Sequence, residues 1–227
     1  MWAVYKKEIK SYFLSPVGYI VIGILLLACT VFFYETTVAV GSADLSQLYF
    51  LAAFYGLIIT IPILTMRMFA EERKNGTEQL ILTSPVSMVG VVVGKYLAAL
   101  SVIGVTLLIS FMYYGIICYF GSPDILIVLA MMLGFILLSG AGIAFGMFAS
   151  SITENQIIAG VITIAFFIVS LFLPDLGKGF PDISIMNFYQ KFQIGVISLT
   201  EVVGAVSFTA MFIAFTIIVM QRRKLVK

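Results

Sequence analysis

The sequence predicts an all-α fold, a polytopic membrane protein with six transmembrane helices. Of its 227 residues, 62% are hydrophobic and only 11% are charged, and the mean hydropathy is +1.14. Soluble domains carry charge on about a quarter of their residues, so this composition indicates a chain that lies largely in a bilayer. Backbone in lipid must satisfy its hydrogen bonds internally, and no barrel-type alternation is present, so the spans are expected to be helices.

Six apolar runs are long enough to cross a hydrocarbon core of about 30 Å. They leave no room for a soluble catalytic domain, so we expect one transmembrane domain over residues 1–227 and any chemistry to be intramembrane or supplied by a partner. The runs occupy residues 17–39, 47–69, 88–120, 125–149, 156–173 and 202–220.

Residues 1–16 carry aromatic and apolar side chains at helical spacing, including Trp2, Tyr5 and Ile9, while the lysines fall elsewhere on the helical wheel. This pattern predicts a helix that lies in the cytoplasmic membrane interface. An ordinary positive flank that fixes orientation is an equally good interpretation. The run at 17–39 is longer than the apolar region of a signal peptide, so we expect it to be retained as a span.

Lysine and arginine predict the orientation of the spans, because cytoplasmic loops carry an excess of these residues. Placing both termini in the cytoplasm puts eleven basic residues inside and two outside. The outer segments then carry Lys178 and Lys191 together with Asp44, Asp124, Asp175 and Asp182. The inner basic residues are Lys6, Lys7, Lys10, Arg67, Arg73, Lys74, Lys95, Arg222, Arg223, Lys224 and Lys227.

The chain has no histidine, which removes the commonest metal ligand and the usual general base. Cys29 and Cys118 lie at different depths of their spans, so we expect no disulfide and interpret both as small buried apolar residues. No ionisable residue lies near the centre of a span, which argues against an ion-coupled carrier and an intramembrane hydrolase. We therefore expect neither a metal nor a cofactor in this chain, and a net charge of +2 gives no indication of nucleic acid.

The segment from Gly90 to Lys95 superficially resembles a phosphate loop. Its glycines are one residue too close together, and no Ser or Thr follows the lysine, so ATP is not expected to bind there. Helix packing is the expected role of Gly90 and Gly94, and also of Gly142 and Gly146 in the fourth apolar run.

A charged segment, residues 67–85, separates the second and third apolar runs and is expected outside the bilayer. It holds six of the 24 charged side chains of the chain. Asn75 and Glu78 have the spacing of a capping box, and Gly76 relieves the turn between them. These signals predict a helix of about two turns over residues 77–83.

Such a helix would expose Leu80 and Ile81 together. We then expect Ser84 to cap, and Pro85 to open, the helix that follows. The pattern predicts a rigid kinked hairpin within a loop at residues 70–87. A basic loop that only sets orientation and a solvated linker are the alternatives, although a mere linker would need neither the capping signals nor the apolar Leu80, Ile81 and Leu82.

Residues 174–198 are too apolar for a freely solvated loop, yet Pro174, Pro181 and several charges prevent them from forming a span. The sequence predicts one or two short helices that lie on the outer membrane face or dip into it. We favour an interfacial anchor with its aromatics at headgroup level over an exit gate. The apolar and aromatic residues of the segment are Phe180, Ile183, Ile185, Met186, Phe188, Tyr189 and Phe192.

Two segments resemble ABC-2-type permease subunits. The first runs from Pro62 to Leu80 (PILTMRMFAEERKNGTEQL) and continues through TSPVS at 83–87 and GKY at 94–96. The second, ISIMNFYQKFQIGVI at 183–197, resembles the segment before the last span of such permeases. Within the family, the chain most resembles the short six-helix permeases of the gliding-motility-associated type.

The resemblance implies a half-transporter that pairs with a second permease subunit, the same or different, and with two copies of a soluble ATPase that binds ATP and Mg. It implies that the chain itself is not an enzyme. In the family, the first cytoplasmic loop forms the coupling helix on the ATPase, residues 1–16 form the connecting helix, and the loop at 150–155 makes a lesser contact. The ATPase-facing positions carried over are Glu71, Glu72, Arg73, Gly76, Thr77, Glu78, Leu80, Pro85 and Glu154.

The resemblance also implies ATP-driven export across a bacterial cytoplasmic membrane by alternating access, along a path between the second and fifth spans. A non-transporting membrane anchor of an ATPase-driven envelope machine is one alternative, and a carrier or channel that works without ATP is another. An apolar path suits a lipid-linked or amphipathic cargo better than a free ion. The positions nominated for the path are Tyr55, Thr60, Pro62, Thr163, Phe166 and Phe167.

Overall fold

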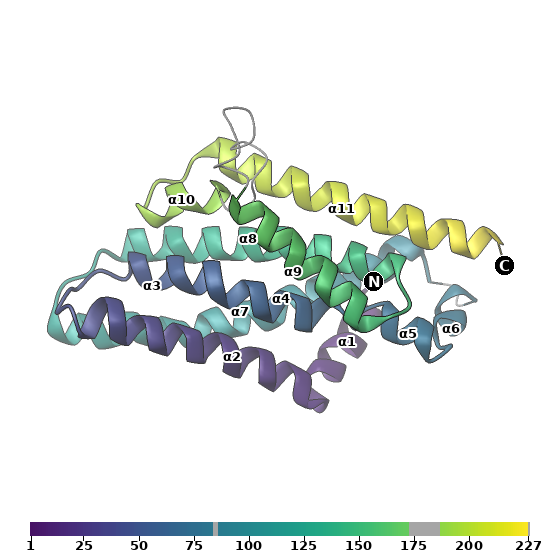
Figure 1. Ribbon diagram of the computed structural model, residues 1–227, viewed down its shortest axis with the longest axis horizontal. Coiled ribbons are helices and arrows are strands. Elements are labelled where there is room, and N and C mark those ends of the chain that lie inside the picture. Colours follow the sequence, from purple (N-terminus) through teal and green to yellow (C-terminus); the bar gives the residue numbers. More distant parts are fainter. Residues whose placement is uncertain (84–85, 173–186, 227) are drawn as a thin grey trace.

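The computed structural model describes residues 1–83, 86–172 and 187–226, and in these ranges every regular element is a helix. The long helices lie side by side in an elongated bundle (Figure 1). Two short helices, α5 (Ala70–Lys74) and α6 (Glu78–Leu82), lie at one end together with the C-terminus, and α10 (Asn187–Gln193) lies toward the other end. The predicted all-α class is confirmed.

Five described segments are long and apolar enough to cross a membrane: Pro16–Val38, Ser46–Lys74, Met88–Phe120, Ile125–Ile152 and Leu199–Leu225. The helix α9 (Gln156–Phe172) is apolar but has 17 residues, which at about 1.5 Å per residue is about 26 Å. Its crossing of the membrane therefore stays a prediction.

The first two spans are composite. The first consists of α2 (Pro16–Phe33) and a π-helical end, η1 (Tyr34–Val38). The second consists of α3 (Ser46–Leu51), the π-helix η2 (Ala52–Gly56) and α4 (Leu57–Thr65), and a turn then leads into α5. Inside α4, Pro62 lacks the N–H that would complete the helical hydrogen-bond pattern.

The remaining long helices are α7 (Met88–Phe120), α8 (Ile125–Ile152) and α11 (Leu199–Val226). The bounds of α7 agree with the predicted span, whereas α8 and α11 extend beyond theirs. The predicted loop at 150–155 is therefore longer than the observed one. The helix α8 continues to Ile152, and only residues 153–155 connect it to α9.

Glycines allow α8 to pack closely in the centre of the bundle. A Cβ atom on Gly142 would lie 2.5 Å from the ring of Phe167 in α9, and one on Gly146 would collide with Thr65 of α4. Cβ atoms on Gly90 and Gly94 would lie 3.1–3.3 Å from neighbouring atoms that include those of Met1. The predicted packing role of all four glycines is confirmed, and the last two pack against the N-terminus.

Residues 1–16 contain a helix, α1 (Trp2–Leu14), that packs across α7. Its Tyr5 hydroxyl lies 3.0 Å from Ser101 Oγ of α7, and its Tyr12 hydroxyl donates to the carbonyl of Leu64 at 3.3 Å. The predicted helix is confirmed, and the alternative of a positive flank that fixes orientation stays a prediction. The position of α1 at a membrane interface stays a prediction.

At the other end, α10 places two aromatic side chains in the core. Tyr189 is buried against the rings of Phe50 and Phe135, and Phe192 is buried against Gly134. Tyr189 and Phe192 are therefore core residues, and the depth of this segment in the membrane stays a prediction. Residues 174–186, including Phe180, Ile183, Ile185 and Met186, lie outside the described residues.

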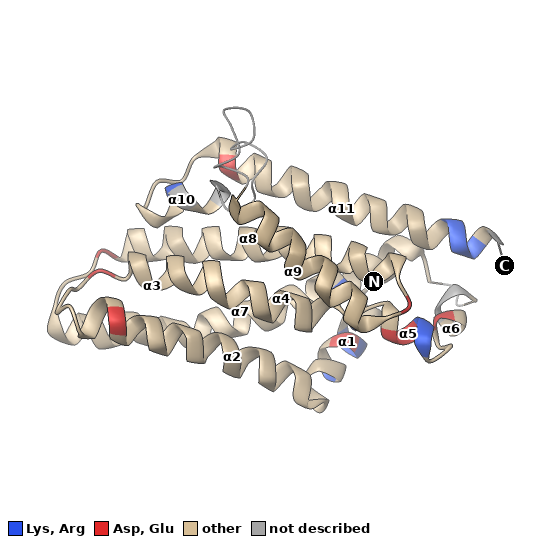
Figure 2. Ribbon diagram, viewed as in Figure 1, with Lys and Arg blue, Asp and Glu red and all other residues tan. Residues whose placement is uncertain are grey.

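Both cysteines are free, as expected. Cys29 is buried, but Cys118 is exposed, so its assignment as a buried residue is wrong. The charged side chains gather at the two ends of the bundle (Figure 2). Lysines and arginines of α1, α5 and α11 surround the end that carries α6, and acidic residues predominate at the opposite end. Which end faces the cytoplasm stays a prediction.

Candidate functional site

The charged hairpin formed by α5 and α6 is the candidate functional site. Gly76, with φ +72°, makes the turn between the two helices, a left-handed conformation that side-chain-bearing residues rarely adopt. The N–H of Gly76 bonds to the carbonyl of Arg73 at 3.0 Å, and Thr77 Oγ1 donates to the carbonyl of Glu72 at 3.2 Å. These contacts close the end of α5 and direct the chain into α6.

The predicted capping box is wrong. Asn75 is the C-cap of α5, with its N–H bonded to the carbonyl of Glu71, and α6 begins at Glu78. The carboxylate of Glu78 pairs with two arginines instead of turning back to the backbone. Hydrogen bonds from a charged guanidinium to the Glu78 carboxylate are stronger than the bond to a backbone N–H that a capping box would require.

The predicted start of the next helix is also wrong. Ser84 and Pro85 lie outside the described residues, and the helix α7 begins only at Met88. Its N-cap is Ser87, whose Oγ accepts the N–H of Gly90 at 3.2 Å. A serine caps the helix as expected, but the serine is Ser87 and not Ser84, three residues earlier.

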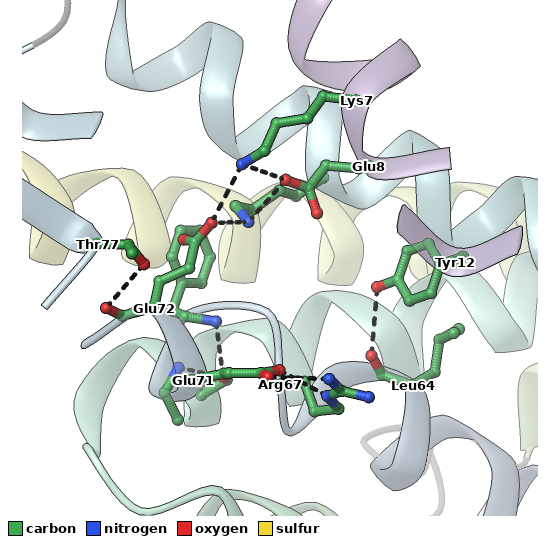
Figure 3. Close-up of polar contacts among 12 residues, drawn as sticks. Lys7, Glu8, Tyr12, Leu64, Arg67, Glu71, Glu72 and Thr77 are labelled. Carbon is green, nitrogen blue, oxygen red and sulfur yellow. Dashed lines mark hydrogen bonds and ion pairs between the residues drawn. The ribbon is translucent and has the colours of Figure 1, made fainter. Parts of the chain in front are cut away.

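Four residues form what we call the α1–α5–α7 network: Lys7 and Glu8 of α1, Glu72 of α5 and Lys95 of α7 (Figure 3). Lys95 is 2% exposed, and its Nζ lies 2.8 Å from Glu72 Oε1 and 3.1 Å from Glu8 Oε1. Lys7 lies 3.8 Å from the same Glu72 oxygen. A buried ammonium needs such partners, because an unpaired charge in the interior is costly.

Arg67 and Glu71 bridge the turn between α4 and α5. The guanidinium makes two hydrogen bonds to the carboxylate, at 2.6 and 2.9 Å, in the forked geometry that arginine favours (Figure 3). Nearby, burial and the Glu8 carboxylate raise the pKa of Tyr12 above its ordinary value. Its phenol therefore stays protonated and donates to the backbone of α4.

A second cluster, which we call the α5–α6–α11 network, consists of Arg73, Glu78 and Arg223. The side chain of Glu78 is 9% exposed and lies 3.4 Å from Arg73 Nε and 3.2 Å from Arg223 Nη1. Arg73 also donates to the carbonyls of Ser151 and Ile152, at 2.7 and 3.3 Å. A cation at the C-terminal end of α8 is favourable because the helix dipole is negative there.

Ser150 of α8 fixes the start of α5. Its Oγ accepts the N–H groups of Phe69 and Ala70, each at 3.1 Å, and donates to the carbonyl of Met66 at 3.1 Å. The first N–H groups of a helix have no partner within it. A serine from another helix therefore acts as the N-cap of α5.

A cavity of about 370 Å³ separates α1 from the hairpin. Its charged lining is balanced, with three basic and three acidic side chains, and no group of three or more His, Cys, Asp or Glu residues among the described positions could hold a metal. Nothing in this lining indicates a cofactor. The lining residues are Lys7, Glu8, Ser11, Tyr12, Ser15, Val17, Arg67, Met68, Glu71, Glu72, Asn75, Thr77, Leu80 and Lys95.

The structure divides the predicted ATPase-facing residues into two groups. Exposed positions are Gly76, Thr77, Leu80 and Glu154, and Leu80 is 72% exposed. Glu71, Glu72, Arg73 and Glu78 instead make ion pairs within the chain. Their part in contacting a partner stays a prediction.

The residues nominated for a path lie mostly inside the chain. Thr60 and Pro62 of α4 and Thr163 and Phe167 of α9 are buried, and both threonine hydroxyls bond to carbonyls of their own helices. Phe166 stacks on Phe145 with ring centroids 3.7 Å apart, and Tyr55 is exposed on η2. The assignment of these six residues to a path stays a prediction.

The structure also identifies residues whose contacts with the hairpin were not predicted from the sequence. They are Glu8, Lys95, Ser150 and Arg223, each of which contacts the hairpin or a residue bonded to it. Lys95 alone gave a signal, as a lysine within an apolar run, whereas the partners of Ser150 and Arg223 lie 80 to 145 residues away.

Comparison with protein families places this hairpin in a known context. The family model described as ABC-2 family transporter protein matches residues 2–181, which include α1 and the whole hairpin. The chain belongs to the ABC-2 transporter family. It is therefore a membrane permease of an ABC transporter, and the matched range ends before α10 and α11. No curated protein matches the sequence, and the gliding-motility subtype stays a prediction.

Proposed function

We propose that the chain couples ATP hydrolysis by a separate soluble ATPase to the export of a substrate. The observation that carries this proposal is the α5–α6 hairpin, which lies at one end of an otherwise apolar bundle and is tied to four other helices. Ion pairs and hydrogen bonds reach from it to α1, α7, α8 and α11. A force applied to the hairpin would therefore be transmitted to the bundle and not absorbed by a loop.

The exposed face of the hairpin is suited to a protein partner. Leu80 presents an apolar side chain among the exposed polar residues Lys74, Thr77 and Gln79. An apolar anchor within a polar rim is typical of the energetic centre of an interface. The exposed side chains of this face are therefore accessible to the ATPase.

In the proposed complex, two copies of the ATPase bind two permease subunits, which are either identical or different. Both termini lie in the cytoplasm of a bacterium, and the hairpin faces the ATPase there. This orientation is supported by the gathering of basic side chains at the hairpin end (Figure 2). ATP and Mg bind to the ATPase, and the permease changes between inward- and outward-open states.

Leu80→Asp tests the interface. We expect it to reduce co-purification of a co-produced ABC ATPase about tenfold, the factor that corresponds to about 1.4 kcal/mol of binding energy. Leu225→Asp is the matched control, because Leu225 is an exposed leucine at the same end of the bundle but on α11. Equal binding by the wild type and both variants would contradict the docking of the ATPase on the hairpin.

ATP-dependent accumulation of cargo in inside-out vesicles separates an exporter from a non-transporting anchor. An exporter loses this accumulation in Leu80→Asp and keeps it in Leu225→Asp. If the complex hydrolyses ATP but moves none of a panel of lipid-linked and amphipathic compounds, the anchor is the better account.

A further inference from the structure

The helix α11 is held by ion pairs at both of its ends. Near its last turn, Arg223 pairs with Glu78 of the hairpin at 3.2 Å. In its first turn, Glu201 pairs with Lys191 of α10 at 2.5 Å. The two attachment points are 22 residues apart in one uninterrupted helix, a span of about 33 Å.

The outer attachment leads directly to core aromatics. Lys191 lies on α10 between Tyr189 and Phe192, whose side chains are both buried in the bundle. A displacement of the first turn of α11 would therefore act on the helix that seats these rings. Gln193, at the end of α10, also contacts Gln47 of α3 at 3.3 Å.

Between its ends, α11 packs mainly along α8. It is the least buried of the five long apolar segments, with 11% of its most apolar stretch buried. Its contacts with α8 and α9 include phenylalanine rings, such as Phe212 on Phe145 and Phe208 on Phe166. Apolar packing of this kind is not directional, so it resists sliding or tilting less than a set of hydrogen bonds would.

We propose that α11 transmits displacement between the hairpin and α10, and that Arg223 is the positioning residue that engages it. A continuous helix carries a displacement along its axis, and each end of α11 is ion-paired to a short helix. Arg223 does not bind a ligand; it makes the last helix move with the hairpin. This role rests on the proposed function for its source of movement, but the linkage itself is a property of this chain.

The test is hydrogen–deuterium exchange on the complete permease in lipid nanodiscs, without the ATPase. We expect Arg223→Gln to accelerate amide exchange in α10 about fivefold, the lower end of the range for coupled sites. Coupling is reciprocal, so Lys191→Gln should accelerate exchange in the hairpin by a similar factor.

Arg222→Gln is the matched control, because Arg222 is exposed and makes no ion pair with any described residue. It should leave exchange in both helices unchanged, and a thermal unfolding curve confirms that each variant is folded. If Arg223→Gln and Arg222→Gln give the same exchange in α10, the linkage is refuted, whatever binds the hairpin. If the exchange result holds but no ATPase binds the wild-type chain, the proposed function fails and the linkage stands.

Discussion

Replacement of Lys95 by methionine should destabilise the chain by about 3 kcal/mol. The ammonium lies 2.8 Å from Glu72 and 3.1 Å from Glu8, and Coulomb's law at an effective dielectric of about 20 gives about 6 and 5 kcal/mol for these attractions. Desolvation of the three charges offsets much of this gain. Removal of one member of a buried ion pair costs about 3–5 kcal/mol of stability. We take the lower value because the side chains of Glu8 and Glu72 are still 12% and 15% exposed to solvent.

Methionine keeps the length of the lysine stem, so the loss reports on the charge and not on a cavity. Thermal unfolding in nanodiscs should show the midpoint lowered by about 6–12 °C relative to wild type. The control is Lys74→Met, because Lys74 is exposed on α5 and has no ion-pair partner among the described residues.

The decisive variant combines Lys95→Met with Glu8→Gln and Glu72→Gln. It removes all three charges, so no carboxylate is left buried without a cation, and most of the lost stability should return. The reasoning is wrong if Lys95→Met unfolds at the same temperature as Lys74→Met, or if the triple variant is less stable than Lys95→Met.

Two further variants test how the hairpin is built. Gly76→Ala places a side chain at φ +72°, which should lower the free energy of unfolding by about 1–2 kcal/mol and accelerate amide exchange in α5 and α6. Gly104→Ala is the control, because Gly104 lies within α7 with open space around its Cβ position, and this variant should not destabilise the chain. Ser150→Ala removes the acceptor for two buried amides at the start of α5 and should cost about 1–3 kcal/mol, measured by thermal unfolding. Ser151→Ala is its control, because within the part of the chain that the structure describes Ser151 Oγ bonds only to a carbonyl of its own helix. Equal losses in the two serine variants would contradict the capping role.

The spans could be predicted because each one is set by its own composition. A helix in lipid satisfies its backbone internally and buries apolar side chains in any direction, so hydropathy along the chain is sufficient. The bounds of α7 followed from hydropathy without error, whereas the helix start assigned to Ser84 and Pro85 from capping signals was wrong. The end of α8 was predicted too early. Ser150 and Ser151 are residues typical of loops, and their hydrogen bonds to residues at and near α5 cannot be inferred from the sequence.

The site was less predictable because its contacts join distant parts of the chain. The segment that carries the hairpin was recognised from its charges, and the turn at Gly76 from local propensity. The capping box failed because Glu78 pairs with arginines. One of them, Arg73, is five residues away, but the other, Arg223, is 145 residues away and cannot be found from the local sequence.

The five-residue helix α5 explains how a small hairpin can act on a whole bundle. A helix of this length is not stable alone, so its position is set by its tertiary contacts. Its neighbouring residues Glu72 and Arg73 project about 100° apart and enter different networks. Glu72 connects to Lys95 and thus to α1 and α7, whereas Arg73 connects to the end of α8 and, through Glu78, to α11. A displacement of α5 must therefore be accommodated on both sides of the bundle, unless one of the two networks breaks.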